Sequence, residues 1–312
     1  MLKLVTQVDA GLLPVQICPE DRIMVLGSCF ADSIGAKLQA GGFDVCVNPF
    51  GTLYNPVSVA NTLARLGADA PFGPEDCVEM GAGAGLICSW WHHTRFARPT
   101  AEEFLADANA ALHSAAQFWR GCNKVIVTLG TAMVWKLAAT GEVVSNCLKR
   151  PAAEFSHEML GVAQTAAVLE RMVASNSGKD FIFTVSPIRH LGEGAHLNTL
   201  SKATLHLALK EIADRVGNDG AGGNDGAGGN DDRAVTPGHD QGSLCYFPAY
   251  EIVLDELRDY RFYADDLVHP SATAVELIWQ RVLDAAVPAR YHEQIRAAEK
   301  ASRIALHRPQ HL

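Results

Sequence analysis

The chain lacks the residue patterns that hold metals, nucleotides or disulfides. Its eight cysteines include no CxxC pair, which argues against a zinc ribbon or a disulfide scaffold and favours reduced thiols. His92, His93, His190 and His269 share no HxH or HxxxH spacing, so we expect no metal site. No GxGxxG sequence and no P-loop occurs, and no cofactor is predicted.

The chain also lacks long apolar runs and an excess of positive charge. No stretch approaches the roughly 18 consecutive apolar residues of a membrane-spanning helix. The opening MLKLVTQVDAGLLP is too polar for a secretory signal, so we expect a cytoplasmic protein with no membrane partner. The formal net charge of -9 disfavours a nucleic-acid partner, which would require a basic face. The sequence does not indicate an oligomeric state.

The composition is that of a globular protein, with 312 residues of which 48% are hydrophobic and 20% charged. Apolar runs at 22–27, 43–47, 124–130 and 181–187 alternate with segments of helical spacing, including 100–120, 157–175 and 198–216. This alternation is typical of βαβ units. We therefore predict a single α/β domain over residues 1–312, a three-layer α/β/α sandwich of flavodoxin-like type with a mainly parallel sheet.

Two insertions interrupt this pattern. Residues at about 71–99 are punctuated by glycine and proline, and we interpret them as irregular structure or a hairpin. Residues at about 217–240 contain a low-complexity repeat of Asn-Asp-Gly-Ala-Gly-Gly between 216 and 233, which predicts a flexible loop without a catalytic role.

Gly27-Ser28-Cys29 joins the first predicted strand to a helix. Ligands of parallel α/β sheets collect at the carboxyl ends of the strands, and a side chain at a helix start meets free backbone N–H groups. Ser28 or Cys29 is therefore a candidate nucleophile in a place suited to stabilising an oxyanion. The competing interpretation is that Gly27 permits the turn and Ser28 caps the helix.

Asp266 and His269 stand three residues apart near the end of the chain, a spacing at which a carboxylate can orient an imidazole. A histidine held in this way can take a proton from a nucleophile and return it to a leaving group. Arg189 and His190 follow another predicted strand, where they suit the binding of a polar or anionic substrate group. A surface salt bridge is the alternative for this pair, and Asp266 is also a plausible helix cap.

Five blocks of the sequence resemble the GSCFA family, which is itself related to the SGNH (GDSL) hydrolases. The blocks occur in the family's order: GSCFA (27–31), NPFGTLYNP (48–56), TLGTAMVW (128–135), FTVSPIRH (183–190) and YFPAYEIVLDELRDYRFYADDLVHPS (246–271). The resemblance implies an SGNH-type fold with esterase or acyltransferase chemistry.

Carried over to this chain, the SGNH pattern assigns the nucleophile to Cys29, two residues after the glycine, with Ser28 as the alternative. Asp266 and His269 match the pattern's aspartate, which orients the histidine, and its histidine, which transfers the proton. The pattern's oxyanion-hole asparagine is missing, because Gly130-Thr131 is followed by Ala132. The resemblance suggests Gly51, Thr131 and Asn146 as groups that could take its place. It also suggests that a histidine-rich stretch, which contains His92 and His93, lines the pocket.

Two functions follow as expectations. The first is hydrolysis or transfer of an acyl ester of a small polar molecule or glycan, with attack by Cys29 or Ser28, proton transfer by His269, and the 27–30 turn as part of the oxyanion hole. The second is a non-catalytic protein that retains an SGNH-like pocket to bind a glycan or peptide, suggested by the missing asparagine.

Overall fold

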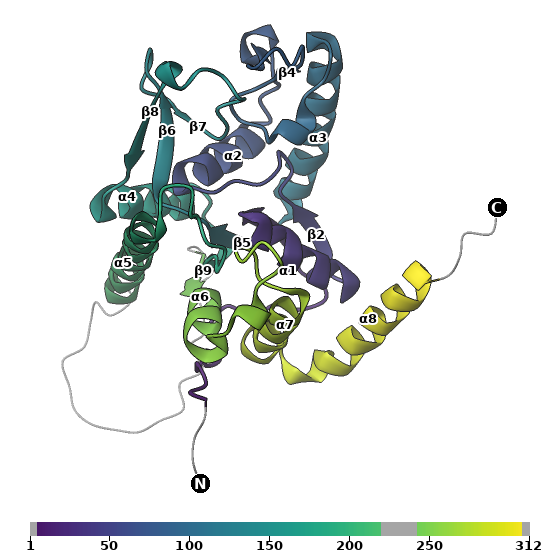
Figure 1. Ribbon diagram of the computed structural model, residues 1–312. Coiled ribbons are helices and arrows are strands. Elements are labelled where there is room, and N and C mark those ends of the chain that lie inside the picture. Colours follow the sequence, from purple (N-terminus) through teal and green to yellow (C-terminus); the bar gives the residue numbers. More distant parts are fainter. Residues whose placement is uncertain (1–4, 220–241, 308–312) are drawn as a thin grey trace.

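The computed structural model describes residues 5–219 and 242–307 and contains a central five-stranded parallel sheet (Figure 1). Its strand order is β10-β9-β5-β1-β2. The strands are β1 (Arg22–Gly27), β2 (Asp44–Val47), β5 (Lys124–Leu129), β9 (Asp180–Val185) and β10 (Leu244–Tyr246). The first four of these strands coincide with runs that the sequence analysis identified as apolar, and β10 lies outside those runs.

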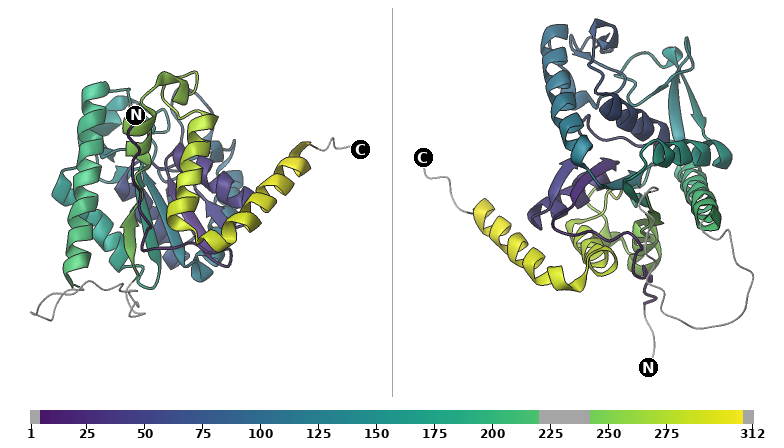
Figure 2. Two further views of the ribbon diagram at one scale, coloured as in Figure 1. Left: turned by 90° about the horizontal axis from the view of Figure 1, so that it is seen from below. Right: turned by 180° about the vertical axis from the view of Figure 1, so that it is seen from behind.

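Helices cover both faces of this sheet, as the views in Figures 1 and 2 show. One face packs against α2, α3, α4 and α5, and the other against α1, α6 and α7. The helices are α1 (Cys29–Ala40), α2 (Pro56–Ala68), α3 (Ala101–Gly121), α4 (Val162–Ala174), α5 (Ala195–Asp219), α6 (Ala249–Glu251), α7 (Ala272–Ala286) and α8 (His292–His307). The predicted three-layer α/β/α sandwich with a parallel sheet is confirmed. Within the described ranges, no helix is long and apolar enough to cross a membrane.

Burial on both faces explains why the strands are continuously apolar. Along β1, Ile23 and Val25 belong to the core beneath α1 and α7, whereas Met24 and Leu26 belong to the core beneath α2 and α3. Alternate side chains of a strand point to opposite faces, so a central strand of a sandwich requires apolar residues at every position.

Residues 71–99 form the predicted irregular insertion with a short hairpin, in which β3 (Val78–Glu79) pairs antiparallel with β4 (Ile87–Cys88). The second predicted insertion is only partly described. Residues 217–219 belong to the end of α5, and 220–240 lie outside the described residues.

The helix predicted over 157–175 is wrong at its beginning. Residues 155–159 form β8 (Phe155–Met159), which pairs with β6 (Met133–Leu137), and β6 also pairs with β7 (Val143–Val144). This small antiparallel sheet stands beside the main sheet between β5 and α4 (Figure 1). Helix α4 begins only at Val162. Helix α7 begins after Pro270, and Ser271 caps it by accepting the N–H of Ala274 at 3.3 Å.

Strands β1 and β5 approach each other closely at the sheet's carboxyl edge. Gly27 has φ +132°, and a Cβ on it would lie 2.2 Å from the carbonyl oxygen of Thr128. The N–H of the next residue, Ser28, donates to that same carbonyl at 3.1 Å. A side chain at position 27 would therefore force apart the strands that this hydrogen bond joins.

We expect Gly27→Ala to lower the free energy of unfolding by about 2–4 kcal/mol, because it combines an unfavourable φ with a clash against backbone. Gly178→Ala is the matched control, since Gly178 has φ +83° with nothing within 4 Å of an added Cβ. This control should cost only about 1–2 kcal/mol. Urea unfolding measures both variants, and equal losses would show that the β1–β5 contact tolerates a side chain.

Candidate active site

Ser28 is fully buried and belongs to a hydroxyl cluster that joins three strand ends. Its hydroxyl lies 2.9 Å from the Oγ of Ser186, to which it donates, and 3.2 Å from the Oγ1 of Thr128. It also caps α1 by accepting the N–H of Phe30 at 3.3 Å. The Ser28 hydroxyl therefore connects the ends of β1, β5 and β9 inside the protein.

Cys29 is the first residue of α1 and is half-buried. Its Sγ lies 3.6 Å from the hydroxyl of Tyr54. The start of a helix presents free N–H groups and the positive end of the helix dipole, which favour negative charge there. Of the two candidate nucleophiles, the accessible one is therefore the thiol.

Tyr54, which the sequence analysis did not identify, contacts the Cys29 sulfur and also lines the pocket described below. Its hydroxyl accepts from the Oγ1 of Thr52 at 3.3 Å, which leaves its own proton free to be donated. Burial, with the neighbouring Cys29, raises the pKa of Tyr54 to about 12 and keeps the phenol protonated. Its carbonyl accepts the N–H groups of Gly130 and Thr131, both at 2.8 Å. Tyr54 thus lies against the segment that begins at Gly130 and Thr131.

Asp266 and His269 form the contact that their spacing predicts. The Nδ1 of His269 lies 2.7 Å from one carboxylate oxygen of Asp266, and the other oxygen accepts the N–H groups of Val268 and His269 at 2.9 Å. These bonds lower the pKa of Asp266 to about 2, the backbone bond from His269 contributing most. The carboxylate holds the Nδ1 proton of the imidazole and leaves Nε2 as the atom that can accept one.

The loop that carries His269 is attached to the end of β9. The N–H of Arg189 donates to the carbonyl of Val268 at 3.2 Å, and its guanidinium donates to the carbonyl of Leu267 at 3.1 Å. The side chains of Asp266 and His269 are 50% and 43% exposed, respectively. Within the described part of the chain, no hydrogen bond joins His269 to the Cys29 sulfur, whose partner is Tyr54.

His190 connects the two halves of the site. Its ring meets the ring of Tyr54 edge-on with centroids 5.4 Å apart, and its Nε2 is buried without a hydrogen-bond partner. Burial, Lys202 and His269 together lower the pKa of His190 to about 4, so the imidazole is neutral at pH 7.

Lys202 on α5 is a second residue that the sequence analysis missed. It is 1% exposed, and its Nζ donates to the carbonyls of Gly130 and Ser186 at 2.6 and 2.7 Å. Burial lowers its pKa to about 7. Lys202 therefore fixes the segments that follow β5 and β9 relative to each other.

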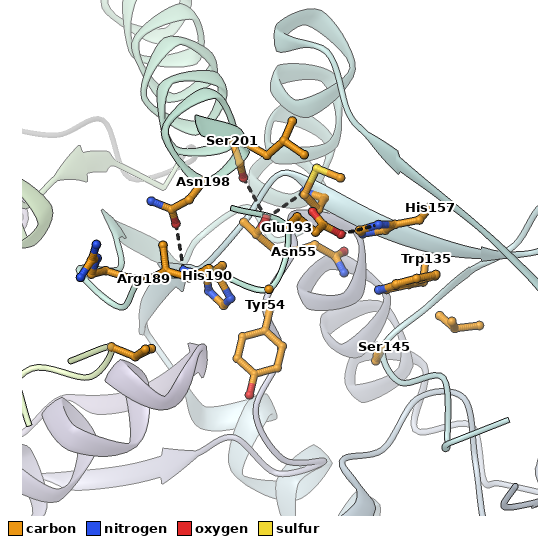
Figure 3. A pocket seen from close by; sticks show the side chains of 17 residues that line it. Tyr54, Asn55, Trp135, Ser145, His157, Arg189, His190, Glu193, Asn198 and Ser201 are labelled. Atoms are coloured by element: carbon orange, nitrogen blue, oxygen red, sulfur yellow. Dashed lines mark hydrogen bonds and ion pairs between the residues drawn. The ribbon is translucent and has the colours of Figure 1, made fainter. Parts of the chain in front are cut away.

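A pocket of about 470 Å³ opens between the carboxyl edge of the main sheet and the small antiparallel sheet (Figure 3). Tyr54, Thr131, Arg189 and His190 line it from the main sheet's edge. Met133, Trp135, Val144 and His157 line it from the small sheet, and Asn198 and Ser201 from α5. Thr131, Arg189 and His190 thus fall where the sequence analysis expected substrate-binding residues.

His92 and His93 do not line this pocket. His92 is fully buried among the rings of Phe50, Phe72, Phe96 and Phe104, and burial lowers its pKa to about 3. The side chain of His93 packs against Gly51, and its Nδ1 accepts the N–H of Arg95 at 3.2 Å. The expected pocket contact is therefore wrong for both histidines, which instead pack the 71–99 insertion against the rest of the protein.

Gly51 and Asn146 do not line the pocket. The N–H of Gly51 donates to the carbonyl of Asn48 at 2.8 Å, so it is not a free donor. The side-chain oxygen of Asn146 accepts the N–H of Leu148 at 2.8 Å, and its neighbour Ser145 lines the pocket in its place.

No set of three His, Cys, Asp or Glu side chains in the described ranges is arranged to hold a metal ion. A model of the GSCFA family matches residues 22–282, and the chain belongs to this family. Neither a curated protein nor a solved structure shows significant similarity to the chain.

The lowered pKa of Lys202 predicts a pH-dependent stability. Below about pH 7 both the folded and the unfolded chain carry the charge, and the folded state bears the full cost of burying it. Between about pH 7 and the ordinary lysine pKa of about 10.4, the unfolded chain binds more protons, so this contribution to stability rises with pH.

Unfolding free energies of wild type and Lys202→Met measured from pH 6 to pH 9.5 isolate this contribution. We expect wild type to gain stability relative to the variant as the pH rises. Parallel curves would mean that Lys202 titrates as an ordinary exposed lysine.

Proposed function

We propose that the protein is an SGNH-like acyl hydrolase or acyltransferase whose nucleophile is Cys29. The observation that carries the proposal is the difference between Ser28 and Cys29. The Ser28 hydroxyl is buried and donates its hydrogen bond to Ser186, whereas the Cys29 thiol lies at the start of α1 beside the Tyr54 hydroxyl. The resemblance of Asp266 and His269 to the SGNH acid and base supports the same chemistry.

In the proposed first step, His269 Nε2 takes the thiol proton and the Cys29 sulfur bonds to the carbonyl carbon of the ester. The carbonyl π electrons move to oxygen, where the Tyr54 O–H and the backbone N–H of Cys29 donate to the oxyanion. The other N–H groups of the 27–30 turn bond within the protein, Gly27 to Asn48, Ser28 to Thr128 and Phe30 to Ser28. The C–O bond to the alcohol then breaks, and the alcohol leaves with the proton held by His269. A thioester remains on Cys29.

In the second step, His269 takes a proton from water or from an acceptor hydroxyl, whose oxygen attacks the thioester. The C–S bond breaks, and the sulfur recovers the proton from His269. Water gives hydrolysis and an acceptor hydroxyl gives acyl transfer. Because His269 contacts Asp266 and not Cys29 in the structure, the step requires its exposed loop to close on the substrate. Catalytic hydrogen bonds often tighten only when substrate is bound.

The missing contact between Cys29 and His269 also favours a second candidate, a non-catalytic protein that binds a polar ligand in the pocket. Under this alternative, substitution of Cys29 or His269 leaves ligand binding intact and no turnover exists to be lost.

Turnover of p-nitrophenyl acetate separates the two candidates. We expect Cys29→Ala to lower the rate by about 10³-fold or more, and His269→Ala by about 10²–10⁴-fold. Ser28→Ala should cost about 1–3 kcal/mol of stability, through its lost buried hydrogen bonds, while folded molecules still turn over. A thiol-directed probe should label Cys29, and a serine-directed probe should not label Ser28.

The matched control is Cys18→Ala, which removes another half-buried free thiol and should leave the rate unchanged. Unchanged rates in Cys29→Ala, Ser28→Ala and His269→Ala together would refute the hydrolase proposal.

The role of Tyr54 has its own test. Tyr54→Phe should lower kcat for the ester by about 10²–10³-fold, the loss typical of one oxyanion donor. Alkylation of Cys29 by iodoacetamide forms no oxyanion, so Tyr54→Phe should lower the rate of alkylation far less than it lowers kcat. Thr52→Val, which removes the hydroxyl that donates to Tyr54, should have the smaller effect on kcat. Equal losses in turnover and alkylation would instead assign Tyr54 to activation of the thiol.

A further inference from the structure

The pocket has an aromatic wall that the proposed chemistry does not use. Trp135 on β6 is 38% exposed although it is a large apolar side chain, and it lines the pocket. Its ring stacks on that of His157, its cross-strand partner on β8, with centroids 3.9 Å apart and an angle of 8° between the planes. The small sheet therefore presents a flat aromatic pair to the pocket.

This wall is fixed from the far side of the pocket. The Nδ1 of His157 lies 2.5 Å from a carboxylate oxygen of Glu193, in the loop between β9 and α5 (Figure 3). Residues from three distant parts of the chain thus cooperate to hold one indole ring in place. A ring held in this way is preorganised for stacking against a ligand, because its orientation need not be paid for on binding.

Polar side chains surround the wall. The amide oxygens of Asn55 and Asn198 accept backbone N–H groups of Ser58 and His190, each at 2.9 Å, which leaves their amide N–H groups as donors. Both asparagines line the pocket, as does Arg189, whose guanidinium donates to the carbonyl of Leu267 at 3.1 Å. A long acyl chain would leave these polar groups unpaired, and such a loss is costly in a pocket.

We infer that the pocket binds a pyranose ring, the sugar part of an acylated glycoside. One face of a pyranose presents C–H groups that match the negative face of an indole, and its hydroxyl groups match the side-chain amides and hydroxyls that line the pocket. A volume of about 470 Å³ suits one or two sugar rings. Cys29 and His269 are not among the residues that line the pocket, but Tyr54 lines it and the Tyr54 hydroxyl lies 3.6 Å from the Cys29 sulfur. An acyl group carried by a bound sugar therefore has to extend past Tyr54 to reach the proposed nucleophile.

This inference deepens the proposed function and rests on it for the position of the ester. Binding is tested separately from chemistry by using Cys29→Ala protein, which performs no turnover. The probes are the methyl pyranosides of glucose, galactose, mannose and xylose, with adenosine as a second stacking ligand, observed by saturation-transfer NMR.

We expect at least one pyranoside to bind the Cys29→Ala protein more tightly than adenosine does. Adding Trp135→Ala should weaken that binding about tenfold or more, whereas Trp135→Phe should retain most of it. Glu193→Gln, which frees His157 and thereby the indole, should fall between these two. Melting temperatures show whether Trp135→Ala remains folded, and Trp135→Phe keeps the test valid if it does not.

The chemical arm uses the same protein with Cys29 present. Trp135→Ala should lower kcat/KM for a mono-O-acetyl ester of the bound pyranoside more than it lowers kcat/KM for p-nitrophenyl acetate. Failure of every pyranoside to bind, tighter binding of adenosine, or equal affinity in Trp135→Ala would overturn the sugar site. Cys29-dependent turnover without sugar binding would overturn the sugar site alone, and sugar binding without turnover would overturn the acyl-transfer proposal alone.

Discussion

The close approach of β1 to β5 at Gly27 is the constraint on which the candidate site depends. Without a Cβ at this position, the N–H of Ser28 reaches the carbonyl of Thr128, and the Ser28 hydroxyl is drawn into the cluster with Thr128 and Ser186. Helix α1 then has to begin at Cys29, with the thiol outside the cluster. The buried serine and the accessible cysteine are therefore two results of one backbone contact.

A second set of interactions arranges the rest of the site around this turn. Lys202 holds the segments after β5 and β9 through two carbonyls, and the carbonyl of Tyr54 holds the start of the segment after β5. The aromatic pair on the small sheet lines the same pocket as His190 and Arg189, and the backbone of Arg189 bonds to the loop that carries Asp266 and His269. The site thus combines a rigid floor at the sheet's edge with an exposed histidine loop, an arrangement suited to closing on a substrate.

The sequence predicted the layers of the fold and the local parts of the site. Apolar runs such as 22–27 and 124–130 are strands because they are buried on both faces, and the Asp266–His269 contact follows from a spacing of three. Tyr54, Lys202 and the pairing of Trp135 with His157 join residues distant in sequence, so no local period indicates them. The burial of Lys202 had one signal in the sequence, because Lys202 lies on the same face of α5 as the core residues Leu205 and Leu209. His92 was misjudged because an aromatic core and a pocket both attract histidine.

The central claim, that Cys29 and not Ser28 carries the acyl group, is tested most directly by peptide mass spectrometry of protein quenched in acid during turnover of p-nitrophenyl acetate. The account predicts one acetyl group on the Cys29 sulfur, which hydroxylamine removes as expected for a thioester. An acetyl group on the Ser28 oxygen would contradict it, as would continued turnover by the wild-type protein with no acetyl group on the 28–29 peptide.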